Sequence, residues 1–181
     1  TVVSYSNFPE KMRQAILAAE DDDFFTHHGI DLFGVGRAVL ANVKTGGRGQ
    51  GASTITMQLA RTTFLSRERS FVRKFYEVLL TLRIEQQLSK SQIFEIYANQ
   101  IFLGQRSYGF ATAAQIYFGK PLSELTIGQM AMLAGLPKAP ARDNPIANPE
   151  RAKQRQRYVL SRMPAISTSQ VPEILLPQPL V

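Results

Sequence analysis

The sequence contains no cysteine in its 181 residues. This absence excludes disulfides, zinc sites built on thiolates, and thiol nucleophiles. It does not decide the cellular compartment, because exported proteins can also lack cysteine. Location has to be inferred from other features of the chain.

Long hydrophobic runs are also absent. No run approaches the roughly 18 to 20 apolar residues that span a bilayer, and the first residues do not form a signal peptide. The chain begins at Thr1 without a methionine. We therefore expect a domain excised from a longer protein, with any membrane anchor or export signal outside this sequence.

Acidic residues are fewer than basic ones. The chain has 14 aspartates and glutamates against 21 lysines and arginines, which gives a net charge of +7. This excess favours polyanionic partners: nucleic acid, an anionic membrane surface, or a substrate that carries phosphate. Hydrophobic residues make up 44% and charged residues 19%, as in an ordinary globular domain with one core.

The most unusual segment is EDDDFFTHHG, from Glu20 to Gly29. A helical pattern that starts at Pro9 places Glu20 near a helix C-terminus. The helix dipole and the neighbouring aspartates disfavour ionisation of Glu20 there, which suits a general base. The alternative is a solvated acidic helix end. The adjacent His27 and His28 lack the spacing to other ligands that a metal site needs.

Two neighbouring stretches favour a substrate region. Residues 31–43 predict a short helix with a broad apolar face, either core or dipping into lipid. After the glycine-rich loop Gly46–Gly51, a helix is expected with Ser53 as its N-cap and Thr54 in its first turn, where an anion can bind. The alternative is an ordinary capped helix, and the P-loop pattern GxxxxGK[ST] is missing.

A longer helix is predicted from about Arg67 to Leu88, with Ser66 as its N-cap. The residues expected on its buried side are apolar: Phe71, Phe75, Val78, Leu79 and Leu82. The residues on its opposite side form a polar stripe: Ser70, Arg73, Lys74, Glu77, Thr81 and Glu85. Two cations and a carboxylate thus project together, although a solvated face with intrahelical ion pairs has the same pattern.

The remaining helices are marked by their caps. Ser89 with Gln92, and Thr126 with Gln129, predict capping boxes, and Asn148 before Pro149 starts the last clear helix. The arginines and lysines of this last helix predict a solvated face or one that rests on acidic headgroups. The segment PKAPARDNP is expected to be an extended loop. No strand pattern is visible before Met163, so the sequence predicts a mainly α domain.

Five segments together resemble the glycosyltransferase domain of peptidoglycan polymerases, as in class A penicillin-binding proteins and monofunctional transglycosylases. EDDDFFTHHG is similar to the family's EDxxFxxHxG, GASTITMQ to GxSTxTxQ, RKFYE to RKxxE, and IFEIYANQIFLG to ILExYxNxxxxG, while LAGLPKAP fits a fifth block. The match predicts a domain over residues 1–163. The proline-rich residues 164–181 are expected to be a linker or the start of a following module.

The resemblance implies a lysozyme-like helical fold with a larger globular lobe and a small membrane-associated lobe. It implies an enzyme that polymerises lipid II into β-1,4 glycan strands by inverting displacement of undecaprenyl pyrophosphate. The expected partners are lipid II, the lipid-linked glycan chain and the outer surface of the bacterial cytoplasmic membrane, without nucleic acid. The resemblance covers both bifunctional penicillin-binding proteins, which carry a transpeptidase domain in the same polypeptide, and monofunctional enzymes, and the sequence does not decide between them.

The resemblance also implies roles for individual residues. Glu20 is the expected general base, and Glu77 is expected to support departure of the leaving group, by ordering cations or by binding Mg²⁺ or another divalent cation. The residues expected to bind or shape the substrate site are Asp21, Phe24, Ser53, Thr54, Gln58, Arg73, Lys74 and Asn99.

Two other functions remain open from the sequence. One is a lysozyme-like lytic glycan hydrolase, which uses a glutamate but needs no cations for a diphosphate. The other is a non-catalytic basic helical module that binds membrane or nucleic acid, in which the acidic residues are merely solvated. Arg73 and Lys74 favour the polymerase over the hydrolase.

Overall fold

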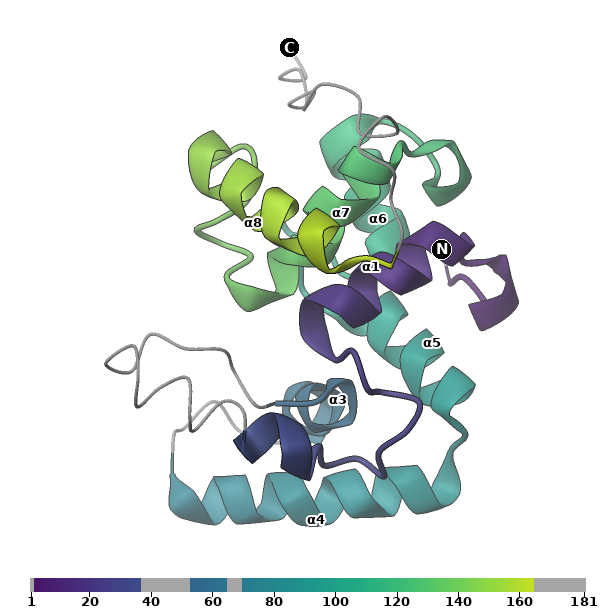
Figure 1. The fold of residues 1–181 in the computed structure, drawn as a ribbon, viewed down its shortest axis with the longest axis vertical. Coiled ribbons are helices and arrows are strands. Elements are labelled where there is room, and N and C mark those ends of the chain that lie inside the picture. The colour runs from purple at the N-terminus through teal and green to yellow at the C-terminus, as the bar shows by residue number, and fades with distance from the viewer. Residues whose placement is uncertain (1, 37–52, 65–69, 165–181) are drawn as a thin grey trace. The chain divides into compact units, whose positions relative to one another are not determined.

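The computed structural model describes residues 2–36, 53–64 and 70–164. Within these residues the regular elements are helices, and the one β-type pairing is an isolated antiparallel bridge between Phe102 and Tyr108. The chain divides into two compact units, a larger one of Thr1–Ala19 with Glu95–Val181 and a smaller one of Glu20–Phe94 (Figure 1). The predicted mainly α fold is confirmed.

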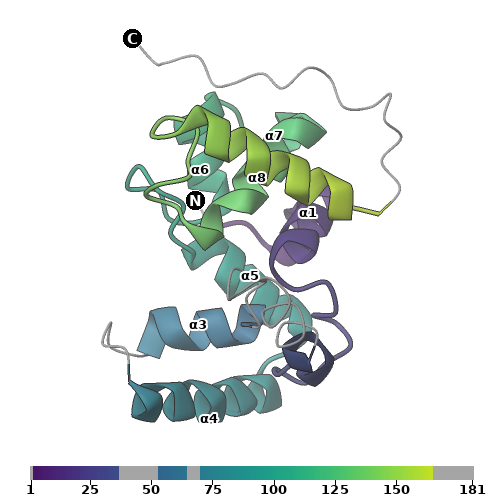
Figure 2. The ribbon, with the colours of Figure 1, turned by 60° about the vertical axis from the view of Figure 1, so that its left-hand side comes forward.

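The larger unit is built around α7. Its elements are η1 (Tyr5–Asn7), most of α1 (Glu10–Glu20), the end of α5 (Lys90–Gln100), α6 (Phe110–Phe118), η2 (Leu122–Glu124), α7 (Ile127–Gly135), η3 (Leu136–Lys138) and α8 (Pro149–Arg162). Helices α7 and α8 lie side by side in both views (Figures 1 and 2). Nearly every residue of α7 is buried, so this alanine- and methionine-rich helix forms the centre of the core.

The two predicted capping boxes are confirmed. The Thr126 side chain accepts from the Gln129 backbone N–H while the Gln129 side chain binds the Thr126 N–H, which completes a capping box. Ser89 and Gln92 make the same reciprocal pair before α5. These bonds satisfy backbone donors that a helix leaves free in its first turn.

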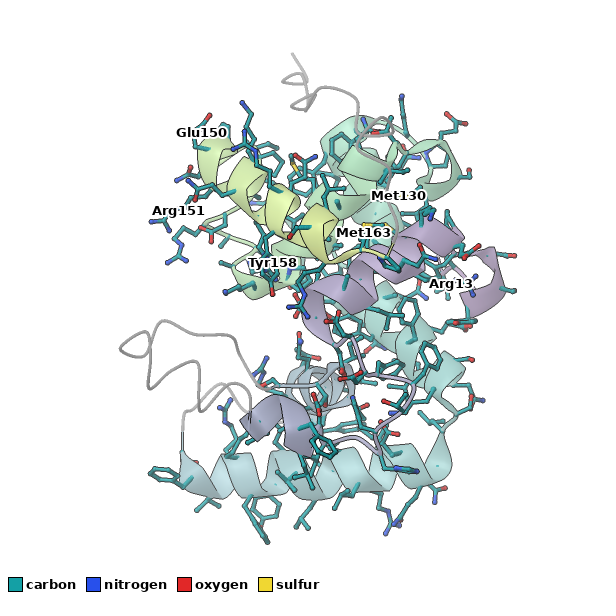
Figure 3. All side chains as sticks on the ribbon, in the orientation of Figure 1. Arg13, Met130, Glu150, Arg151, Tyr158 and Met163 are labelled. Carbon is teal, nitrogen blue, oxygen red and sulfur yellow. The ribbon has the colours of Figure 1, made fainter. Side chains whose placement is uncertain are left out.

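Helix α8 uses part of its positive charge inside the larger unit. The guanidinium of Arg155 donates to the Ala19 carbonyl at 3.2 Å, and that of Arg162 donates to the Ala18 carbonyl at 2.9 Å. Both guanidiniums also lie over the ring of Tyr158, a residue labelled in Figure 3. The prediction of a wholly solvated or headgroup-binding face is therefore wrong for these two arginines, which bind the last turn of α1.

The segment before α8 is a series of turns and not the extended loop that its prolines suggested. The buried side chain of Asn144 organises it: its Nδ2 donates to the Pro140 carbonyl at 2.8 Å, and its Oδ1 accepts from the Ala147 N–H at 2.8 Å. Proline restricts φ without excluding turns, and an asparagine side chain can replace backbone partners in them. The buried Asn144 amide therefore connects the turns of this segment by hydrogen bonds.

The smaller unit contains α3 (Ile55–Phe64), α4 (Phe71–Gln87), a helical stretch at residues 32–36, and the first turn of α5. Helix α3 packs along α4 (Figure 2). Helix α4 begins at Phe71 and not near Arg67 as predicted, and its N-cap is Ser70, which accepts from the Arg73 N–H at 3.1 Å. The predicted cap Ser66, the loop Gly46–Gly51 and the tail from residue 165 lie outside the described residues.

The orientation of α4 is opposite to the one predicted. Phe71 is 96% exposed and Phe75 62% exposed, whereas Glu77 and Thr81 are completely buried. The other apolar positions of the stripe are half-buried or exposed: Val78, Leu79 and Leu82. An amphipathic pattern indicates that two faces of a helix differ, but not which of them faces protein. Here the polar face points inward and carries the site.

Candidate active site

Glu20 is the last residue of α1, as predicted, and the first residue of the smaller unit. Its Oε2 accepts a hydrogen bond from Nε2 of Gln58 at 2.8 Å. Gln58 belongs to α3 and is only 7% exposed. A buried amide therefore binds one oxygen of the carboxylate that the sequence marks as a base.

Asp21 follows Glu20 but has a different environment. Its carboxylate accepts from the His27 Nε2 at 2.9 Å and from the backbone N–H of Ile55 at 3.0 Å. The Gly29 N–H donates to the His27 Nδ1, so this histidine is neutral and carries its proton on Nε2. Asp21 thus connects the loop to the start of α3.

The N-terminus of α3 is satisfied by the protein itself. Thr54, and not Ser53, is its N-cap, because the Thr54 Oγ1 accepts from the Met57 N–H at 3.1 Å. The same hydroxyl donates to the Gly29 carbonyl at 2.6 Å. The sequence predicted an anion at this terminus, where dipole and free N–H groups favour one. The anion found there is the Asp21 carboxylate.

A second set of contacts joins α3 to α4 and α5. The Thr56 hydroxyl and the Lys90 Nζ both donate to Oε1 of Glu85, the latter at 2.8 Å. The Lys90 ammonium also lies 4.4 Å from the ring centroid of Phe24, which is completely buried. Sequence analysis placed Glu85 on the polar stripe but gave no role to Lys90. The two partners of Lys90 come from α4 and from the segment after Glu20, and no local pattern predicts that these meet.

The inward face of α4 carries the predicted cations. The Lys74 Nζ donates to Oε1 of Glu77 at 2.6 Å, and the Lys74 side chain remains 47% exposed. The other oxygen of Glu77, Oε2, is buried without a hydrogen-bond partner, and so is Nε of Arg73. An unpartnered buried polar atom costs about 1 to 3 kcal/mol. The two atoms lie one helical turn apart on α4.

The structure brings most of the predicted site residues into one unit. Glu20, Asp21, Phe24, Ser53, Thr54 and Gln58 belong to the smaller unit together with Arg73, Lys74 and Glu77. Asn99 belongs to the larger unit, where its side chain accepts from the Val3 N–H at 2.9 Å and donates to the Val3 carbonyl at 2.8 Å. Its described contacts therefore hold the N-terminal segment.

Comparison with known proteins shows the family of this chain. Residues 1–164 match the family model described as Transglycosylase. The fold and the match define a helical glycosyltransferase domain, and the chain belongs to the transglycosylase family.

Individual relatives match most of this chain. Penicillin-binding protein 1A of Neisseria cinerea is 59% identical over 157 residues, which cover 87% of this chain and 20% of that protein. A putative transglycosylase of Cupriavidus necator is 55% identical over 161 residues, 89% of this chain and 69% of that protein. The crystal structure of penicillin-binding protein 1A from Haemophilus influenzae matches with a TM-score of 0.52 and 29% identity, over 94% of this chain and 16% of that one. The chain spans about a fifth of the penicillin-binding relatives.

Proposed function

We propose that this domain polymerises lipid II into β-1,4 glycan strands. The supporting observation is that the smaller unit contains both a glutamate at a helix end, bound by a buried amide, and a cation-flanked carboxylate on the inward face of α4. A glycosyl transfer to a hydroxyl group needs a base for the acceptor and charge stabilisation for the leaving group. A hydrolase of uncharged glycan has no diphosphate leaving group and therefore needs no cations to bind one.

In the proposed reaction, the C4 hydroxyl of the acceptor lipid II attacks the anomeric carbon of the lipid-linked chain. Glu20 takes the hydroxyl proton as the new C–O bond forms. The bond between the anomeric carbon and the diphosphate oxygen breaks, and undecaprenyl pyrophosphate leaves with the bonding electrons. Attack from the face opposite the leaving group converts the α linkage into a β linkage.

The leaving diphosphate is assigned to Arg73 and Lys74. Both are cationic, and Nε of Arg73 has no hydrogen-bond partner within the described structure. Negative charge that develops on the leaving oxygen is stabilised by cations already held in place. Glu77 holds Lys74 in position through their 2.6 Å contact. It therefore supports departure of the diphosphate without touching the sugar.

A divalent cation such as Mg²⁺ is proposed only together with the substrate. The described residues contain no group of three metal-ligating side chains, but Oε2 of Glu77 is a buried acceptor without a hydrogen-bond partner. Mg²⁺ commonly binds one or two carboxylates together with substrate phosphates. Glu77 would hold such an ion, which would supply further charge neutralisation for the diphosphate.

Replacing Lys74 by alanine should weaken binding of the diphosphate-bearing lipid by about tenfold, which corresponds to roughly 1.4 kcal/mol. Binding of a neutral glycan oligomer should not change, because the lost interaction is with the diphosphate. Fluorescence titration of both ligands measures the difference. Arg83→Ala is the matched control, since Arg83 is an exposed cation on the same helix. Equal losses for the two ligands would assign Lys74 to packing.

The other predicted substrate residues are proposed to have different roles, according to their contacts. Asp21, Phe24 and Thr54 are buried with partners inside the protein, so we assign them to building the pocket around Glu20. Ser53 is half-buried before α3 and remains proposed for binding the donor. Asn99 is proposed to support the larger unit through residue 3.

The outer face of α4 is proposed to contact lipid at the outer face of the bacterial cytoplasmic membrane. Phe71, Val72, Phe75 and Tyr76 are each more than half exposed, and so are Leu32 and Phe33 of the same unit. Apolar side chains with nearby basic residues are typical of membrane-surface segments. Among the described residues, no helix is long and apolar enough to cross a membrane.

Replacing both Phe71 and Phe75 by serine should reduce binding to anionic lipid vesicles by more than tenfold. Each phenylalanine contributes about 1.5 to 3 kcal/mol when it is transferred out of water. Cosedimentation with vesicles of mixed anionic and zwitterionic lipid measures the change. Ile146→Ser is the control, since Ile146 is 57% exposed in the larger unit. An equal loss of vesicle binding in both variants would show that the outer face of α4 does not make the membrane contact.

The longer protein is also a matter of proposal. We infer that the domain occupies residues 1–163, that residues 164–181 lead to a following module, and that a transpeptidase domain belongs to the same polypeptide. The support is the match to penicillin-binding protein 1A relatives, of which this chain covers a fifth.

Polymerisation of purified lipid II by the purified domain, read as glycan chain length, tests the proposed function. Release of fragments from finished glycan without polymerisation would instead identify a lytic enzyme.

A further inference from the structure

We propose that Gln58 is a positioning residue for Glu20: its side-chain amide holds the carboxylate in the orientation that accepts the proton of the attacking hydroxyl. The inference rests on the proposed function. It is narrower than the expectation that Gln58 binds or shapes the substrate site. The contact that carries it is the 2.8 Å hydrogen bond from the Gln58 Nε2 to Oε2 of Glu20.

The chemistry of the two groups decides which end of the amide faces Glu20. An ionised carboxylate only accepts hydrogen bonds, so the nitrogen of Gln58 and not its oxygen must point to it. A donor to a carboxylate favours the ionised form, which is the form that acts as a base. The bond thus orients Glu20 and keeps it ready to accept a proton.

The backbone that carries Gln58 is anchored on both sides of its first turn. Ile55 donates to Asp21, the residue after Glu20, so α3 is fixed to the chain segment that contains the base. One residue further along α3, the Thr56 hydroxyl donates to Glu85, which is also bound by Lys90. Two polar contacts, one of them buried, therefore fix the first turn of α3 and with it the position of the Gln58 amide.

Two segments of the smaller unit that meet at Glu20, its own and α3, carry charged residues. In its own segment, Asp21 is bound by neutral His27, and Asp22 and Asp23 follow. Helix α3 carries Arg61 one turn after Gln58. All these groups stay unchanged when Gln58 is substituted, so a change in the pH dependence of the reaction reports the amide.

The experiment measures initial rates of lipid II polymerisation by the full chain from pH 5 to 9, for the wild-type protein, Gln58→Met and Gln58→Glu. Methionine keeps the length of the side chain but donates no hydrogen bond. We expect kcat to fall by about ten- to a hundredfold, and the acidic limb of the kcat profile to move upward by about one pH unit. KM should change less than twofold.

Gln58→Glu gives a second, isosteric test that retains polarity and shape. Two carboxylates at hydrogen-bond distance cannot both ionise easily, so the acidic limb should move further upward than in Gln58→Met. The control is Gln86→Met, an exposed glutamine on α4, which should leave rate, KM and pH profile as in the wild type. Thermal unfolding of each protein identifies any loss that comes from misfolding.

The outcomes separate this inference from the proposed function. An increase in KM with an unmoved acidic limb, in either variant, would overturn the positioning role and assign Gln58 to substrate binding. If Glu20→Gln polymerises lipid II normally, the proposed base itself is wrong. If Glu20→Gln is inactive while both Gln58 variants keep the wild-type profile, the proposed function stands and the inference fails.

Discussion

Glu20→Gln is expected to lower the rate of lipid II polymerisation by about 10²- to 10⁴-fold, the usual contribution of a general base. The change keeps the size of the side chain, and the new amide oxygen can still accept from Gln58. What is lost is the capacity to take a proton at neutral pH. The folded structure should therefore survive while the chemical step fails.

The measurement is the initial rate of polymerisation under saturating substrate, together with thermal unfolding. Glu10→Gln is a matched control, because Glu10 is an exposed glutamate at the start of the same helix and binds only its neighbour Gln14 among the described hydrogen bonds. Normal polymerisation by the Glu20 variant would show that Glu20 is not the general base. Loss of activity with a large fall in unfolding temperature would show a structural role instead.

Gly29→Ala is expected to destabilise the protein by about 3 kcal/mol. Gly29 has φ +89°, and a Cβ atom there would lie 2.7 Å from Cγ2 of Thr81 and 2.9 Å from Cγ of Glu85. A left-handed conformation costs a non-glycine residue about 1 to 2 kcal/mol, and overpacking of a filled core adds about 1 to 3 kcal/mol. The new methyl group would press on the buried face of α4.

Urea denaturation gives the free energy of unfolding of each variant. Gly119→Ala is the matched control, because Gly119 has φ +64° but open space around a Cβ atom. It should lose only the conformational part, about 1 kcal/mol. Equal losses of unfolding free energy at the two positions would mean that the close approach to Thr81 and Glu85 costs no stability, because α4 moves to accommodate the new methyl group.

Local sequence signals determined much of the helical framework. The capping boxes at Ser89 and Thr126 were predicted correctly because each involves residues only three apart, whose side chains and backbone groups meet once a helix starts. Glu20 was correctly placed at a helix end because the helical pattern that starts at Pro9 runs as far as Glu20. The motifs shared with the transglycosylase family identified the domain, which the family match over residues 1–164 confirmed.

Contacts between distant segments could not be predicted in this way. The anion at the start of α3 is the Asp21 carboxylate, and the cap is Thr54 and not Ser53. Both contacts depend on where the segment from Glu20 to Gly29 lies against the start of α3. Lys90 gained its partners Glu85 and Phe24 only through the packing of three segments.

Helix α4 shows the limit most clearly. The sequence by itself determined that α4 has one apolar and one polar face, since the 3.6-residue period separates Phe71 and Phe75 from Glu77 and Thr81. Only the tertiary structure decided that the polar face is buried and the phenylalanines are exposed. The physical reason is that burial depends on which surface finds partners, and the polar residues find theirs inside the smaller unit.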